Sequence, residues 1–248
     1  MPSIAIDSRF CGPKTSGNGG YSAGLIAKDF EAKIDSAVKV TLRSPPPLGE
    51  PIEIRPNEKG IEAVHGDQLV ATAKASSVTI ELPPLPSEAA VEAARVHYEA
   101  RADHHLLPHC FVCGVGRHPG DGLRIFAGQV QDRPLHADYW TPTDDLTDDD
   151  GLVGTEFLWA ALDCPGYFAL RPEGQLCLLG QFAVDIHRRP QAGEKLLCLA
   201  WSNGHDGRKF FADSAIVDEN GGLIAAANAV WIRIDDPQML ERMRRENS

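Results

Sequence analysis

The sequence predicts an α+β fold in which antiparallel strands wrap around central helices, and two observations lead to this prediction. Similar segments occur twice in the same order along the chain, which is typical of a tandem duplication. Each copy contains one helix-forming stretch followed by several strand-like stretches that short Pro- and Gly-rich turns separate. A parallel sheet needs a crossover helix for almost every strand, so this order favours antiparallel pairing.

The first copy begins at Asn18-Gly19-Gly20, and the apolar pattern after it predicts a helix over residues 20–34. Strands are then expected over 38–42, 52–55, 60–64 and 69–81. The second copy begins at Gly154-Thr155-Glu156, which predicts the start of a second helix. Its strands are expected over 123–129, 135–140, 176–187, 194–203, 209–217 and 223–234, with a hairpin turn at 218–222.

A helical connector is predicted between the copies. Residues 87–103 are rich in helix formers, Ser87 is a good N-cap and Glu88 suits the positive first turn. The prolines just before Ser87 end the preceding strand. We therefore expect a first unit at 1–86, a connector at 87–103 and a second unit at 104–248.

Charge and hydropathy exclude several functions. The net charge of −11 argues against nonspecific binding to nucleic acid or to an anionic membrane. No apolar run reaches the roughly 18 residues that span a bilayer, and the first residues lack a secretory pattern, so a cytoplasmic protein is expected. Six cysteines are too few for a disulfide scaffold, and four of them are interpreted as core residues: Cys11, Cys164, Cys177 and Cys198.

Three short motifs resemble those of a known family. Cys110-Phe-Val-Cys-Gly114, Gly122-Leu-Arg-Ile-Phe126 and Trp159-Ala-Ala-Leu-Asp163 are similar to segments of hot-dog fold acyl-CoA thioesterases. The resemblance covers nearly the whole chain and implies a double hot-dog: two antiparallel sheets, each wrapping a central helix, form an intramolecular pseudo-dimer. It also implies an acyl-CoA substrate, no cofactor, and a possible homodimer of two such chains.

The resemblance also implies one composite catalytic site. In the phenylacetyl-CoA type of thioesterase, His-Gly-Gly starts the helix and a carboxylate follows nine residues after the His. Here the first copy has Asn18 in place of His and Ala27 in place of the carboxylate, whereas the second copy keeps only Asp163. The implied site joins Asn18, Gly19, Gly20 and Tyr21 of the first unit to Asp163 of the second, and the mirror site would be inactive.

The chemistry of these residue types suits thioester hydrolysis. Backbone N–H groups at a helix start stabilise the negative charge that gathers on an attacked carbonyl. Asp163 would activate water or attack directly, while Asn18 would add a donor or only cap its helix. Pro165 is expected to kink or end the second helix, so Asp163 would lie near a helix end, or would cap a new turn starting at Pro165.

Several other polar residues are candidates for binding or structural roles. Arg188 and Arg189 are candidates for binding the phosphates of coenzyme A. Glu156 is interpreted as an acid that suits the helix dipole. Cys110 and Cys113 with His104, His105, His109 and His118 offer zinc ligands, but the spacing fits no standard finger and no metal is expected. The acidic residues at 144–150 are interpreted as a solvated loop.

Three alternative functions stay open at this point. The main one is a non-catalytic acyl-CoA- or lipid-binding protein of the same fold, because neither copy retains the full family pattern. A second is a hydratase acting on enoyl-CoA, for which no convincing Asp/His pair is found. A third is a serine hydrolase with Ser22 as nucleophile, because Gly20-Tyr-Ser-Ala-Gly24 matches the nucleophile elbow, although the surrounding strands do not alternate with helices.

Overall fold

The computed structural model describes residues 2–31, 36–101, 105–170 and 176–247. Its helices are α1 (Gly19–Glu31), α2 (Glu88–Glu99), α3 (Thr155–Leu170) and α4 (Pro237–Asn247). Its strands are β1 (Ser3–Ala5), β2 (Val38–Leu42), β3 (Pro51–Asn57), β4 (Gly60–His65), β5 (Gln68–Ala75), β6 (Gly128–Gln129), β7 (His136–Trp140), β8 (Leu176–Ile186), β9 (Leu196–Asp206), β10 (Lys209–Val217) and β11 (Leu223–Ile234).

The strands form a single 11-stranded sheet in the order β1-β3-β4-β5-β2-β8-β11-β10-β9-β7-β6, and every pair of neighbouring strands is antiparallel. The first half of the chain supplies one side of the sheet and the second half supplies the other. The predicted antiparallel α+β class is therefore confirmed.

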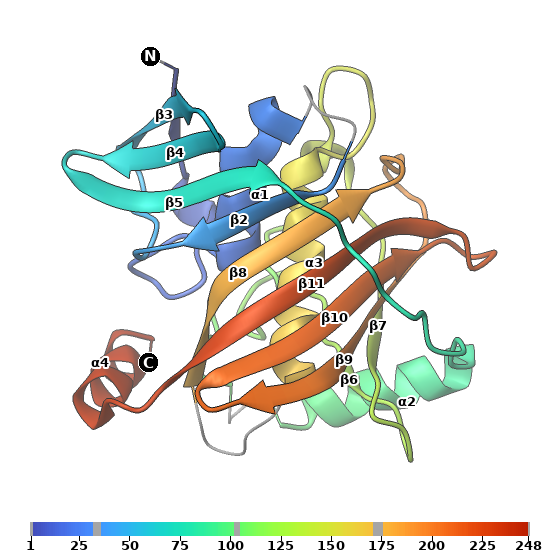
Figure 1. The fold of residues 1–248 in the computed structure, drawn as a ribbon. Coiled ribbons are helices and arrows are strands. Elements are labelled where there is room, and N and C mark those ends of the chain that lie inside the picture. The colour runs from blue at the N-terminus through green and yellow to red at the C-terminus, as the bar shows by residue number, and fades with distance from the viewer. Residues whose placement is uncertain (1, 32–35, 102–104, 171–175, 248) are drawn as a thin grey trace.

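The prediction of two separate sheets is wrong in one respect, because β2 and β8 join them. These strands pair with Val38 opposite Val184 and Thr41 opposite Gln181. An unpaired edge strand exposes a row of N–H and C=O groups, and this pairing satisfies them at the centre of the molecule. The seam lies where the two halves of the chain meet (Figure 1).

Helices α1 and α3 pack on the same face of the sheet and on each other (Figure 1). Residues of both halves share one hydrophobic core, in which the indole of Trp159 on α3 meets the ring of Phe182 on β8 edge-on. The segment after β5 crosses the opposite face of the sheet on its way to α2 (Figure 1). None of the described helices is long and apolar enough to cross a membrane.

The predicted connector helix is observed as α2, which Ser87 caps by accepting a hydrogen bond from the Ala90 N–H group. Its apolar residues Val91 and Ala94 pack on the second half of the chain, against Leu135 and Leu199. The predicted residues 102 and 103 lie outside the described part of the chain, as do 32–34 at the end of the first helix.

Two predicted strands are shorter in the structure. β5 ends at Ala75 rather than at residue 81, because Ala75 is opposite Val38, where its partner strand β2 begins. Only Gly128–Gln129 of the predicted strand 123–129 pairs as a strand. The preceding residues bond instead to the turn at 110–114: the Leu123 N–H donates to Phe111 O and the Ile125 N–H to Val112 O.

Pro165 is expected to kink or end the second helix, and the expected helix end is wrong. α3 continues to Leu170, so Asp163 lies in the interior of the helix, and Pro165 starts no new turn that Asp163 could cap. Burial in the core holds the helix together at this point, and the Ser214 hydroxyl on β10 donates to the Leu162 carbonyl at 2.8 Å. Asp163 is therefore separated by almost two turns from the C-terminal end of α3 at Leu170.

Candidate functional site

Asn18 fixes the start of α1 with both ends of its side chain. Its Oδ1 accepts a hydrogen bond from the Tyr21 N–H at 2.9 Å, so Asn18 is the N-cap. Its Nδ2 donates to Asp163 Oδ2 at 3.1 Å. The two interpretations of Asn18 are therefore compatible, since the residue caps its helix and also donates a hydrogen bond to the acid of the other half.

Asp163 reaches the same helix start from the interior of α3. Its Oδ2 accepts the Gly20 N–H at 2.8 Å, while its Oδ1 is buried with no hydrogen-bond partner among the described residues. A Cβ atom on residue 20 would lie 2.5 Å from the Asp163 Cβ and 2.6 Å from the Trp159 carbonyl oxygen. Only glycine at position 20 lets the two helices approach closely enough for this contact.

Asp163 is only 3% exposed, and this burial raises its pKa to about 7. The Gly20 N–H and the Asn18 amide oppose the shift, because they stabilise the carboxylate, whereas the nearby Cys110 adds to it. A carboxyl group with this pKa gains and loses a proton near neutral pH, as a general base requires.

Among the first four backbone N–H groups of α1, three have hydrogen-bond partners in the described part of the chain. The Gly20 and Tyr21 amides donate to side chains, and the Ser22 N–H donates to Asn18 O at 2.9 Å. The Gly19 N–H has no hydrogen-bond partner in the described part of the chain. The two glycines of the predicted Gly19-Gly20 pair therefore differ: the Gly20 N–H bonds to Asp163, whereas the Gly19 N–H has no partner among the described residues.

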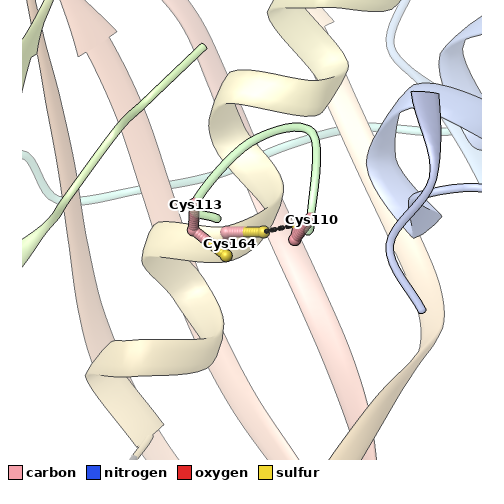
Figure 2. A group of neighbouring side chains, drawn as sticks. All are labelled: Cys110, Cys113 and Cys164. Atoms are coloured by element: carbon pink, nitrogen blue, oxygen red, sulfur yellow. Dashed lines mark hydrogen bonds between the residues drawn. The ribbon is translucent and has the colours of Figure 1, made fainter. Parts of the chain in front are cut away.

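Three thiols lie beside this pair, a convergence that the sequence analysis missed. Cys110 and Cys113 come from the turn at 110–114, and Cys164 follows Asp163 on α3 (Figure 2). Asn18 Nδ2 lies 3.7 Å from Cys110 Sγ and 3.8 Å from Cys164 Sγ. Hydrogen bonds from Cys113 and Cys164 lower the pKa of the Cys110 thiol well below its usual range, and the same contacts with Cys110 raise the pKa of Cys113 and of Cys164 well above it.

The remaining predicted site residues have other partners. The Tyr21 ring is 5% exposed and stacks on Phe10 at a centroid distance of 4.1 Å, so it belongs to the core. Arg188 bonds to Glu194 and Asp218. Arg189 bonds to two acids of the acidic loop and to two carbonyl groups: Asp148, Asp150, Leu152 and Val153.

The mirror junction carries a different set of groups. Ala27, at the carboxylate position of the first copy, is fully buried and has no ionisable group. Glu156 in the first turn of α3 forms an ion pair with Lys28 at 3.0 Å. One turn after Ala27, Glu31 accepts a hydrogen bond from the Trp159 indole at 3.3 Å, and burial raises its pKa to about 7. The sequence analysis did not single out Glu31.

Ser22 and the described histidines near Cys110 and Cys113 do not adopt the arrangements that a nucleophile elbow and a zinc finger require. Ser22 lies inside α1 and is fully buried rather than at the exposed tip of a strand–turn–helix elbow. His105 Nδ1 accepts the Leu107 N–H, His118 is exposed, and neither His105, His109 nor His118 belongs to the described sulfur cluster. His104 lies outside the described residues.

Comparison with solved structures establishes the fold. A conserved protein of unknown function with hot-dog fold from Alicyclobacillus acidocaldarius has a TM-score of 0.58 and 15% sequence identity, covering 94% of this chain and 93% of that protein. The tesB protein of Mycobacterium avium subs paratuberculosis has a TM-score of 0.56 and 15% identity, covering 90% and 89%. No family model and no curated protein matches the sequence. The chain has the hot-dog fold.

Proposed function

We propose that the chain is a double hot-dog acyl-CoA thioesterase with one composite site, formed by the start of α1 and by Asp163 of α3. One observation carries the proposal: the carboxylate of the second half lies 2.8 Å from the Gly20 N–H and 3.1 Å from the Asn18 amide of the first half. These groups are 143 and 145 residues apart in sequence, and the sheet and helix packing bring them together.

The order of the strands supports the two-unit interpretation. Leaving out the short β6, the sheet order β1-β3-β4-β5-β2 of the first half corresponds to β7-β9-β10-β11-β8 of the second, with α1 and α3 after the first strand of each half. The units meet at β2 and β8, as the subunits of a dimer with twofold symmetry would. The proposed first unit spans residues 1–86, the connector spans 87–103 and the second unit spans 104–248.

In the proposed reaction, the thioester carbonyl oxygen accepts a hydrogen bond from the Gly19 N–H at the positive end of α1. Asp163 either activates a water molecule that adds to the carbonyl carbon, or attacks that carbon itself to form a mixed anhydride that water then hydrolyses. In both routes the C–S bond breaks, coenzyme A leaves as its thiol, and the acyl group ends as the free acid. Gly20 and Asn18 hold the Asp163 carboxylate in position. Since Asp163 and Asn18 are each only 3% exposed, the substrate must open this junction to enter.

The role of Arg188 and Arg189 as phosphate ligands stays a prediction. It would require both guanidinium groups to exchange their present acidic partners, among them Glu194 and Asp150, for phosphate oxygens. Fork-shaped guanidinium groups bind carboxylates and phosphates with the same geometry, so such an exchange is chemically reasonable.

The test compares Asp163→Asn with Asp213→Asn. Asp213 is also a buried aspartate, but it lies on β10 next to Ser214, facing away from α3, and bonds to Asn228. Release of free coenzyme A from a panel of acyl-CoA thioesters is followed by chromatography. We expect Asp163→Asn to lower kcat by about 10²–10⁴-fold, and Asp213→Asn to leave it within about twofold of wild type. Equal turnover in both variants would refute the assignment of Asp163.

A non-catalytic acyl-CoA-binding protein is the second candidate function. One observation favours it: the Gly20 and Asn18 donors already bond to Asp163, which leaves a single amide of the helix start for a substrate carbonyl. Calorimetric binding of an acyl-CoA by the wild-type protein, with no release of coenzyme A, would support this function over hydrolysis.

A further inference from the structure

We propose that Cys110, Cys113 and Cys164 bind one zinc ion. Their sulfur atoms all lie within 4.8 Å of one another, and all three residues are buried. Two come from one turn and the third comes from α3, so an ion here would tie that turn to the helix that carries Asp163 (Figure 2). The proposal does not depend on thioesterase activity.

The separation of the Cys110 and Cys164 sulfur atoms suits a tetrahedral zinc ion, and Cys113 Sγ lies within 4.8 Å of both. With Zn–S bonds of about 2.3 Å and tetrahedral angles, two sulfur ligands lie roughly 3.8 Å apart. Cys110 Sγ and Cys164 Sγ are 3.7 Å apart. All six cysteines of the chain are free, so none of these three is committed to a disulfide.

The turn at 110–114 is built to bring its two sulfur atoms together. The Gly114 N–H donates to the Cys110 carbonyl at 2.9 Å, which closes the turn around Cys113. A Cβ atom at position 114 would lie 2.4 Å from that carbonyl oxygen and 2.6 Å from the Pro108 carbonyl oxygen, so only glycine fits. The Tyr98 hydroxyl donates to the Cys113 carbonyl at 3.0 Å and ties the end of the turn to α2.

One amide group lies beside two of the three sulfur atoms. Asn18 Nδ2 lies 3.7 Å from Cys110 Sγ and 3.8 Å from Cys164 Sγ, and one of its two hydrogens can point to a sulfur atom while the other bonds to Asp163 Oδ2. Donors in the second shell orient metal ligands and stabilise their charge. Thiolate sulfur is a soft ligand that selects zinc over magnesium or calcium, which prefer oxygen. The proposal assigns these three ligands and leaves the fourth position to a non-cysteine donor.

The test measures zinc in wild type, in Cys113→Ser and in Cys198→Ser. Cys198 is a buried cysteine outside the cluster, so its variant is the matched control. Each protein, reduced, is incubated with Zn²⁺, desalted and analysed for metal by mass spectrometry. We expect one zinc ion per chain in wild type and Cys198→Ser, and at least a tenfold lower content in Cys113→Ser. No retained zinc in wild type, or equal contents in the two variants, would overturn the proposal.

A second measurement uses only wild type, in case Cys113→Ser does not fold. X-ray absorption at the zinc edge should show a coordination shell with three sulfur atoms at about 2.3 Å. Cobalt substitution should add a sulfur-to-cobalt charge-transfer band. A shell of oxygen and nitrogen alone, with no such band, would contradict the three-thiolate site.

Discussion

The contact between α1 and α3 predicts that Gly24→Ala destabilises the protein. Gly24 faces α3, and a Cβ atom there would lie 2.7 Å from both Glu156 Cα and Trp159 Cβ, and 2.8 Å from Trp159 Cγ. Carbon atoms in contact prefer about 3.5–4.0 Å, so the helices would have to separate by roughly 1 Å. Neither neighbour yields easily, because one is backbone and the other is a fully buried indole.

Two opposing effects determine how much Gly24→Ala changes the free energy of unfolding. Overpacking a well-packed interior costs about 1–3 kcal/mol, and the rigid neighbours here place the cost near the upper end. Replacing glycine by alanine inside a helix returns about 1 kcal/mol. The net loss in the free energy of unfolding is therefore about 2 kcal/mol, which lowers Tm by roughly 4–8 °C in a chain of this size.

Gly166→Ala is the matched control, because Gly166 is also a helix residue. A Cβ atom there would lie 3.6 Å from Ala212 Cβ and Trp231 Nε1, an ordinary contact distance. This variant should gain up to about 1 kcal/mol from helix propensity alone. Thermal and urea unfolding followed by circular dichroism measure both variants. The packing argument is refuted if Gly24→Ala is as stable as wild type, or if Gly166→Ala loses more stability than Gly24→Ala.

Two further predictions concern buried polar groups. The folded-state pKa of Glu31, about 7, lies above its unfolded value of 4.5, so its ionisation lowers stability as pH rises between these values. Glu31→Gln keeps an acceptor for the Trp159 indole and should match wild type near pH 4.5. At pH 8 its unfolding free energy in urea titrations should exceed that of wild type by about 3 kcal/mol, since each pKa unit corresponds to about 1.4 kcal/mol. A difference that stays constant with pH would contradict this. Ser214→Ala removes the hydrogen bond to the Leu162 carbonyl and should cost about 1 kcal/mol. Ser22→Ala should cost less, because the buried Ser22 hydroxyl has no partner among the described residues, and the reverse order in thermal unfolding would contradict the reasoning.

Much of the fold could be predicted because its signals are local. Alternation and turn residues indicated the hairpin of β10 and β11, whose bounds agree with the prediction. Ser87 correctly predicted where α2 begins, because its side chain caps the helix. Pro165 misled the prediction, since its local preference is overridden by burial of α3 between the sheet and the other helix.

The site was predictable only in part. The resemblance pointed to Asp163 and to the Asn18-Gly19-Gly20 segment, and the structure does place Asp163 against Asn18 and Gly20. The approach of Cys164 to Cys110 depends on how a distant turn packs on α3, which no local pattern encodes. Only two sequence features pointed to this cluster of cysteines: the Cys-x-x-Cys-Gly spacing at 110–114, and Cys164 directly after the predicted acid.

The pairing of β2 with β8 has a consequence for any attempt to divide the chain. Cutting between residues 86 and 104 and isolating either fragment would strip one partner from this central ladder, and would uncover the face of α1 or α3 that the other helix covers. Exposed strand edges beside apolar surface promote self-association. Each fragment alone should therefore aggregate or dimerise, whereas co-expression of both should restore a single soluble heterodimer.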